Sequence, residues 1–269
     1  MNNSTRFAAD VMWCCVLFWS LAGVAVWAEE INILFVGDAD APANLGARQG
    51  LAEANAQGEF LGIRYRLVSG AAGEAVEPAP VAVIAAVNTT RLRHLAKQFS
   101  ELPVLNTTIK ETFLREDCWS NLFHIGPSAA MLEDAERQWQ RKAPGSTATA
   151  RAWHPTFRKY AAAQLNARFR ERFDSDMDDD AWSGWAAMKL LSDTIARQPT
   201  LSGGLLVEEL KTNLAFDGQK GSDMSFRETG QLRQPLLLVA DDRIVGEAPV
   251  RGVVNTTNLD SLGVPFCPK

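Results

Sequence analysis

Short apolar segments alternate with helical patterns over the first half of the chain, and this alternation most restricts the possible folds. Ile31–Val36 is apolar apart from Asn32, and Val81–Val87 is apolar throughout, as strands buried on both faces are. Further strands are predicted at 63–68, 102–105 and 122–125, and helices at 45–56, from a cap at 88–90 to 99, and at 129–141. Because strands that alternate with helices form a covered parallel sheet, we predict a doubly wound α/β lobe over residues 29–141.

The chain changes character after this lobe. Residues 142–152 are polar and rich in small residues, which is typical of a linker. The part from 153 to 269 is predicted to begin with helices at about 155–173, 179–197 and 204–214. It is predicted to end with strands at 224–226, 232–240 and 244–245, the last two joined in a hairpin through Asp241-Asp242.

The N-terminus has the pattern of an export signal. Arg6 precedes an uncharged run from Val11 to Ala28, and this run ends in the small-residue pattern Val26-Trp27-Ala28 that signal peptidase cleaves. A membrane anchor is the alternative, because eighteen uncharged residues nearly span a bilayer. The Ser and Gly residues in the run favour cleavage near Ala28. We therefore expect residues 1–28 to be a signal peptide and the remainder to be exported.

Charge and cysteine content limit the possible partners and metals. A formal net charge of −5 disfavours nucleic-acid binding, which requires a basic surface. After signal removal two cysteines remain, Cys118 and Cys267, and in an oxidising compartment one disulfide between them is expected. Two free buried thiols are the alternative. Two distant thiols and three scattered histidines predict no zinc or other metal site.

The sequence contains no recognisable catalytic constellation. It has no nucleophile elbow, no Gly-rich phosphate loop and no pair of histidines at metal spacing, so we predict that the protein is not an enzyme. Asp38 follows the first strand, at the edge where open α/β sheets bind ligands. Its carboxylate can accept a hydrogen bond from a ligand or cap the next helix.

Aromatic residues and histidines have both structural and functional interpretations. His124 lies within a strand and is predicted to be a hydrogen-bonded core residue. Trp153 and His154 stand in a polar segment, where they can line a cleft or pack against a helix start. Trp182 and Trp185 recur at helical spacing, which predicts burial rather than cofactor binding.

Several segments resemble one group of bacterial exported proteins. They are 44–48 with 55 and 58–62, 116–118 with 121–128, 152–155, 230–239 and 258–263. These segments are similar to substrate-binding proteins of ABC transporters encoded with the pyrroloquinoline quinone (PQQ)-dependent alcohol dehydrogenase system. That group belongs to the leucine/isoleucine/valine-binding class. The resemblance runs over nearly the whole mature chain, and the order and number of matches carry it.

The resemblance implies a periplasmic protein with the type I periplasmic binding fold, in which two α/β lobes close on a ligand. Only thirteen residues, 140–152, separate Trp139 from Trp153, whereas a βαβ unit needs about 30. The core of the second lobe is therefore missing at 142–152. We expect an intact N-terminal lobe (29–141) and a C-terminal segment (153–269). This segment is expected to hold a truncated second lobe of helices and a terminal hairpin that returns to the body.

The same resemblance implies a small-molecule ligand, an ABC permease in the inner membrane as partner, and a link to a quinoprotein dehydrogenase. The expected ligand is PQQ or a small metabolite of alcohol oxidation, with no cofactor required. PQQ is flat and carries three carboxylates, which arginine binds through two parallel hydrogen bonds. The candidate ligand-binding residues are Asp38, Trp153, His154, Arg227 and Arg233, with Lys220 as a further cation.

The missing strands favour an alternative function. A degenerate member of this group would act as an interaction or scaffold protein in the periplasm. In that case the face left by the lost strands should be apolar and should drive self-association.

Overall fold

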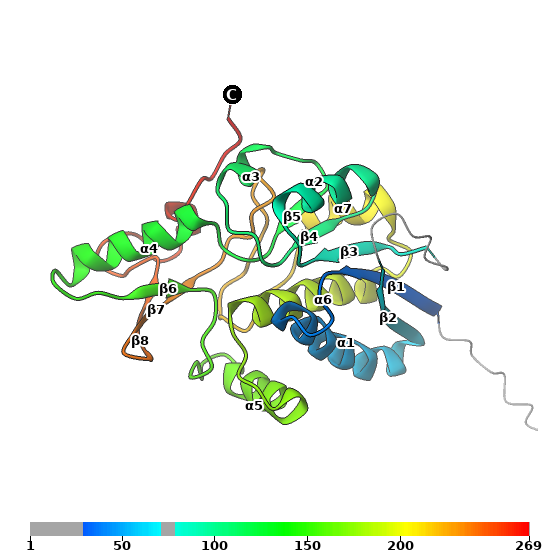
Figure 1. Cartoon of the computed structure of the whole chain (residues 1–269), viewed down its shortest axis with the longest axis horizontal. Coiled ribbons are helices and arrows are strands. Elements are labelled where there is room, and N and C mark those ends of the chain that lie inside the picture. Colours follow the sequence, from blue (N-terminus) through cyan, green and yellow to red (C-terminus); the bar gives the residue numbers. More distant parts are fainter. Residues whose placement is uncertain (1–28, 71–78, 269) are drawn as a thin grey trace, which may run out of the picture.

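Five parallel strands form the main sheet of the computed structural model, which describes residues 29–70 and 79–268 (Figure 1). The predicted signal peptide, residues 1–28, lies outside the described residues. The strands are β1 (Glu29–Val36), β2 (Ile63–Ser69), β3 (Ala82–Ala85), β4 (Val104–Asn106) and β5 (Leu122–His124). Their spatial order is β2-β1-β3-β4-β5, and every pair is parallel. The predicted parallel sheet is confirmed.

Both faces of this sheet are covered by apolar side chains. In β1, Ile33 and Phe35 belong to one hydrophobic cluster, whereas Leu34 and Val36 belong to another. All four are at most 1% exposed. Because alternate residues of a strand point to opposite faces, the apolar run Ile33–Val36 of this central strand places apolar side chains on both faces of the sheet.

Helices contribute the apolar side chains that pack against the strands in these two hydrophobic clusters. The helices α1 (Pro42–Leu61) and α6 (Asp179–Arg197) lie below the sheet in Figure 1, and α2 (Thr89–Gln98) lies above it. The short α3 (Phe113–Glu116) joins the α2 side through Leu114. The Asn88 side chain caps α2 by accepting a hydrogen bond from the Arg91 amide, as predicted.

The later helices differ from expectation in their position. The helices α5 (Ala162–Phe173), α6 and α7 (Gly203–Thr212) share the hydrophobic cluster of β1 and α1, so they complete the first lobe instead of forming a second one. Helix α6 is buried on nearly all sides because it packs closely along α1 and also contacts β3 and α7. Helix α5 begins later than predicted, since Tyr160 and Ala161 have positive φ angles of 52° and 68°.

A smaller antiparallel sheet lies beside the first lobe. It contains β6 (Thr149–Arg151), β7 (Leu236–Ala240) and β8 (Arg243–Ala248), and α4 (Ala129–Lys142) covers one face. The predicted hairpin is confirmed, and Asp241 and Asp242 in its turn have φ angles of 48° and 58°. Two predictions were wrong. The linker 142–152 contains β6, and α4 packs on this second sheet rather than on the main one.

The strand that was predicted at 224–226 does not form in the described part of the chain. Met224 and Phe226 form only isolated bridges, to Phe216 and Leu232.

The expected disulfide is present, because Cys118 and Cys267 are bonded and tie the C-terminal tail to the loop after α3. A single 3-10 turn, η1 (Leu259–Ser261), lies in this tail.

Two general properties follow from the described part of the chain. Every helix there is too short or too polar to pass through a bilayer. Among the same residues, no group of three or more His, Cys, Asp or Glu side chains is arranged to hold a metal ion.

Candidate functional site

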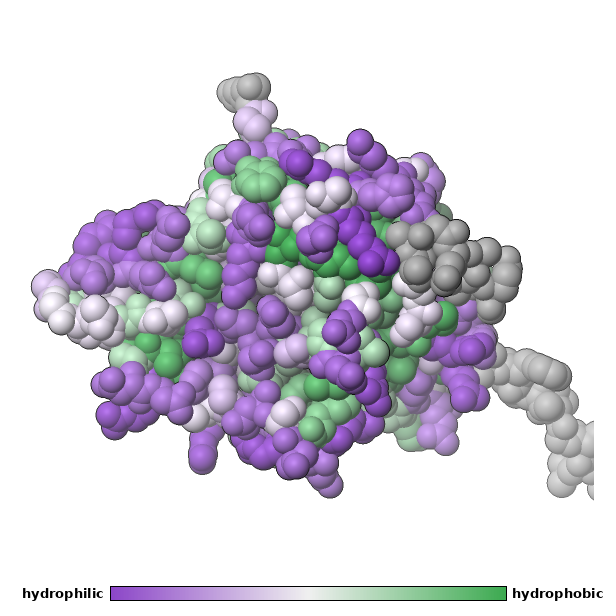
Figure 2. Space-filling model, viewed as in Figure 1, coloured by the Kyte–Doolittle hydropathy of each residue, from purple (hydrophilic) through white to green (hydrophobic). Residues whose placement is uncertain are grey.

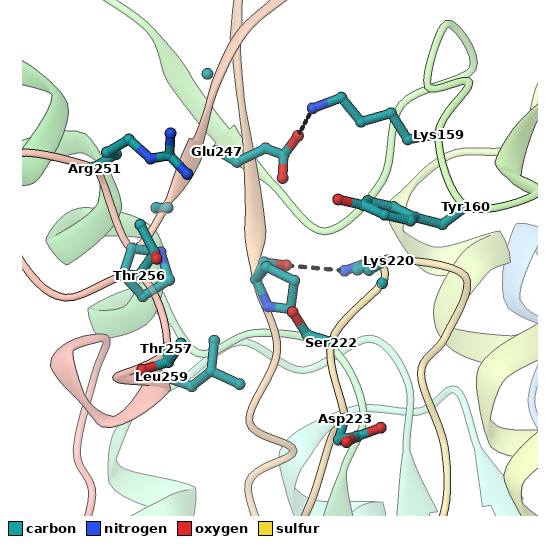
Figure 3. A pocket seen from close by; sticks show the side chains of 15 residues that line it. Lys159, Tyr160, Lys220, Ser222, Asp223, Glu247, Arg251, Thr256, Thr257 and Leu259 are labelled. Carbon is teal, nitrogen blue, oxygen red and sulfur yellow. Dashed lines mark hydrogen bonds and ion pairs between the residues drawn. The ribbon is translucent and has the colours of Figure 1, made fainter.

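A cleft of about 800 Å³ lies between the second sheet and the first lobe (Figure 3). The second sheet contributes Gly246–Pro249, mostly from β8. The first lobe contributes the turn at Lys159 and Tyr160 and the loop Lys220–Asp223, while Arg251, Thr256, Thr257 and Leu259 come from the tail. The cleft is therefore built from three parts of the chain that are distant in sequence.

Gln234 connects the cleft wall to the main sheet. Its Nε2 donates a hydrogen bond of 2.6 Å to the carbonyl oxygen of Ile125, the residue directly after β5. Its Oε1 accepts a hydrogen bond of 2.7 Å from Lys220 Nζ, and Lys220 lines the cleft. The cleft thus lies toward the carboxyl end of a parallel strand, which is where open α/β sheets bind ligands.

Lys220 is a buried cation in this wall. Besides the bond to Gln234, its Nζ donates to the carbonyl oxygen of Pro235 at 3.2 Å and lies 3.7 Å from the centroid of the Trp182 ring. Burial lowers the pKa of Lys220 well below its usual value, and the charge of Asp179 opposes this shift. Because its ammonium contacts protein groups, Lys220 supports the wall of the cleft.

An ion pair crosses the mouth of the cleft. Lys159 Nζ lies 2.5 Å from Glu247 Oε1, and Figure 3 shows the two side chains reaching toward each other from opposite sides. The hydrogen bond and the charge of Glu247 raise the pKa of Lys159. Arg251 is exposed and makes no side-chain hydrogen bond or ion pair with the described part of the chain. The mouth therefore carries two cations and one carboxylate.

Trp153 does not have the position that its predicted role requires. The residue is 1% exposed, its Nε1 donates to Asn166 Oδ1 at 2.8 Å, and its ring stacks on Trp182 with centroids 6.0 Å apart. An indole enclosed in this way has no face free for a flat ligand. The structure supports the alternative interpretation, in which Trp153 packs against the start of a helical region.

Arg227 and Arg233 hold the C-terminal tail. Both donate to Asp260 Oδ1, at 2.8 Å and 2.9 Å. Arg227 is buried and also donates to the carbonyl oxygens of Leu259 and Leu262, each at 2.7 Å. Burial lowers the pKa of Arg227, and Asp260 opposes that shift. These contacts give both guanidinium groups a structural role in holding the tail, and their contact with a ligand stays a prediction.

His154 and Asp38 are placed apart from each other and from the cleft lining. His154 is buried, with Nδ1 2.8 Å from Thr156 Oγ1 and Nε2 3.1 Å from Asp242 Oδ1 in the β7–β8 turn. Asp38 is exposed and accepts a hydrogen bond from the Asp40 amide at 3.0 Å, while α1 begins after Ala41. Asp38 therefore stabilises its own loop and does not cap the helix.

His124 is the hydrogen-bonded core residue that its strand position predicts. It is 1% exposed, and Asn106 Nδ2 lies 3.0 Å from its Nδ1. Burial lowers the pKa of His124 well below its usual value, and the nearby charge of Arg115 lowers it further. The ring is thus a neutral part of the sheet interior.

The cleft residues were missed by the sequence prediction, apart from Lys220. Lys159 and Glu247 are 88 positions apart, so no local pattern connects them. The sequence contains only a weak indication that Arg251 belongs to a binding site. Arg251 lies between Pro249 and Gly252, in a segment with no helical or strand periodicity. An isolated charge in such a loop is usually solvated, and only the folded chain brings these residues together.

Comparison with known proteins identifies the fold. No protein-family model and no curated protein matches the chain. Among solved structures, a branched-chain amino acid ABC transporter periplasmic ligand-binding protein from Burkholderia xenovorans is similar. Its TM-score is 0.65 at 10% identity, with 81% of this chain and 95% of that chain covered.

Two ligand complexes are also similar. The substrate-binding protein from Desulfitobacterium hafniense in complex with Leu has a TM-score of 0.63 at 14% identity, covering 80% of this chain and 99% of that one. The branched-chain amino acid transporter substrate-binding protein from Streptococcus pneumoniae in complex with isoleucine has a TM-score of 0.59 at 9% identity, covering 81% and 99%. The chain thus has the fold of type I periplasmic binding proteins, with a complete parallel sheet and a small second sheet.

Proposed function

We propose that this chain is an exported solute-binding protein that delivers a small molecule to an ABC permease in the inner membrane. The observation that carries the proposal is the cleft of about 800 Å³ between the second sheet and the first lobe. Its volume lies in the range of about 300–1,000 Å³ that is usual for small-molecule sites. Solved proteins of the same fold are ABC transporter binding proteins, some of them in complex with leucine or isoleucine.

The proposed ligand is PQQ or a small metabolite of PQQ-dependent alcohol oxidation. Lys159 and Arg251 offer cations to a carboxylate at the mouth of the cleft, and Tyr160 offers an aromatic ring beside it. The protein itself requires no cofactor for binding. A quinoprotein dehydrogenase is the proposed functional neighbour, and the periplasm, reached after cleavage near Ala28, is the proposed location.

Binding would act by shifting the relative position of the two sides of the cleft. The second sheet and the first lobe meet through the Lys159–Glu247 pair and through His154 and Asp242. A ligand held by both sides favours the closed arrangement in proportion to its extra contacts there. A permease can recognise that arrangement.

The test is equilibrium dialysis of the mature protein against PQQ, leucine and isoleucine separately. Saturable binding of one molecule per chain is expected for at least one of them. The Arg251→Gln variant should bind that solute about tenfold more weakly, because a charge-assisted hydrogen bond is lost. Arg172, which is exposed on α5 outside the cleft, provides the matched control Arg172→Gln. No saturable binding by the folded protein would contradict the proposal.

The scaffold alternative lacks the surface that it requires. One face of the second sheet is covered by α4, through residues such as Met131 and Leu238. The other face packs on the main cluster through Leu237 and Val239. On the side shown in Figure 2, hydrophobic residues form small patches between hydrophilic ones, and hydrophilic residues cover the outer side of α4. Among the described residues, both faces of this sheet are thus largely covered, and Val245 of β8 is the large hydrophobic residue of the sheet that stays exposed, at 41%.

A further inference from the structure

Two cations flank one carboxylate at the mouth of the cleft. Lys159 lies in the turn before α5, Glu247 lies in β8, and their ion pair joins the two sides. Figure 3 shows Arg251 on the other side of Glu247, whose carboxylate points away from Arg251 and toward Lys159. Asp223, the second acidic residue of the lining, lies at the opposite end of the cleft in the same view.

The cations of the cleft differ in how far they are available to a ligand. Lys220 is committed to Gln234, Pro235 and the Trp182 ring. Arg251 has no side-chain partner within the described ranges, and Lys159 has only Glu247. An anionic ligand therefore meets one unpaired cation and one whose partner is a carboxylate of the protein.

The Lys159–Glu247 pair is suited to exchange. The Lys159 side chain is 62% exposed and that of Glu247 is 32% exposed, and ion pairs in contact with water contribute little to stability. A carboxylate from a ligand can replace Glu247 without leaving a buried charge unpaired. It also gains Arg251, whose guanidinium binds a carboxylate through two hydrogen bonds.

We infer that Glu247 occupies the place of a ligand carboxylate, and that the cleft takes carboxylate-bearing solutes by exchanging Glu247 for the ligand between Lys159 and Arg251. This inference rests on the proposed function and names the chemical class of its ligand. Glu247 then determines specificity. A solute without a carboxylate has no means of displacing it, whereas a strong anion does.

The experiment is isothermal titration calorimetry with two pairs of probes, namely PQQ and its trimethyl ester, and leucine and leucinamide. Each is titrated into the wild type, Glu247→Gln and the control Glu171→Gln, which removes an equal charge from an exposed site on α5. Removing the competing carboxylate should tighten binding of the acid by about two- to fivefold, since an exposed ion pair has to be broken only in the wild type. The ester or amide should bind much more weakly than its acid.

The outcomes separate this inference from the proposed function. Tighter binding of an acid by Glu247→Gln, with unchanged binding by Glu171→Gln, supports the exchange. Binding of an acid that is unchanged or weakened in Glu247→Gln overturns the exchange and leaves the proposed function in place. Equal affinity for an acid and its ester or amide also overturns it. If none of the four probes binds the folded wild type, both proposals are rejected.

Discussion

Gly184 in α6 lies against the carbonyl oxygen of Ala43 in α1, so closely that a Cβ atom on Gly184 would be 1.9 Å from that oxygen. The contact is reciprocal, because a Cβ atom on Gly46 of α1 would be 1.8 Å from the carbonyl oxygen of Ala181 in α6. The two helices thus approach backbone to backbone. This close approach fixes α6 to the first lobe.

Gly184→Ala should therefore destabilise the protein. In an open helix this change stabilises by up to about 1 kcal/mol, but here the helices must separate, and overpacking of this kind costs about 1–3 kcal/mol or more. Gly204 in α7 is the matched control, because the nearest atom to its Cβ position is 3.9 Å away. Urea unfolding should show a lower midpoint for Gly184→Ala and an unchanged or higher one for Gly204→Ala. Equal midpoints for the two variants would contradict the helix contact.

Arg227→Met should weaken the attachment of the C-terminal tail. The Arg227 side chain is 0% exposed, so its removal takes away one of the two guanidinium donors to Asp260 and the guanidinium donor to the carbonyl oxygens of Leu259 and Leu262. Breaking a buried pair of this type costs about 3 kcal/mol. Thermal unfolding should show a large loss for Arg227→Met and a smaller one for Arg233→Gln, whose side chain is 26% exposed. A loss from Arg227→Met no greater than that from Arg233→Gln would be inconsistent with this role.

Reduction of the Cys118–Cys267 disulfide should destabilise the chain. The bond joins residues 149 positions apart, and a loop of that length corresponds to about 5 kcal/mol in the chain-entropy treatment, of which about 2–4 kcal/mol is typically observed. The urea midpoint of the wild type should fall on addition of dithiothreitol. Cys118→Ser and Cys267→Ser should each show the lower midpoint without reductant, and the double variant should add nothing further. A reductant-sensitive midpoint in the double variant would exclude this explanation.

Asp180 should make stability depend on pH. Burial, together with the charges of Asp178 and Asp179, raises the pKa of Asp180 from 3.8 to about 6. The folded state therefore binds this proton more tightly than the unfolded state does. The stability that it contributes is present at low pH and is lost as the pH rises from 3.8 through about 6.

Asp180→Asn removes this titration. Relative to the wild type, the variant should gain stability between pH 4 and pH 7, by about 1 kcal/mol after allowance for the partial exposure of the carboxylate. The measurement is the free energy of unfolding in urea across that range. The exposed Asp40 provides the control Asp40→Asn, which removes an equal charge. A difference from the wild type that is constant with pH for Asp180→Asn, or a gain no larger than that of the control, would contradict the assignment.

The order of strands and helices in the first lobe could be predicted because each element has a strong local pattern. The apolar run of β1 and the Asn88 cap are examples, and both appear in the structure. Strand β6 could not be predicted in the same way. Its three residues, Thr149–Arg151, are too few to show an alternating pattern, and they pair with β7 nearly 90 residues later.

The candidate site was harder to predict for the same physical reason. Trp153, Arg227 and Arg233 have side chains suited to a carboxylate-bearing aromatic ligand. In the fold Trp153 and Arg227 are buried, and all three donate hydrogen bonds to other protein groups. In the sequence, nothing distinguishes Lys159 and Glu247 from other charged residues. They form an ion pair only because the fold places β8 opposite the turn before α5. Pairings across such distances depend on tertiary structure.

Hydrogen exchange followed by mass spectrometry tests most directly whether a solute binds in the cleft between the second sheet and the first lobe. The mature protein is exchanged alone and with saturating PQQ, leucine or isoleucine. Slower exchange is expected in peptides that cover 158–161, 220–223 and 246–251, the segments around the cleft. Protection by no solute, or protection confined to the loop around Asp38 and the other strand ends of the main sheet, would contradict this expectation.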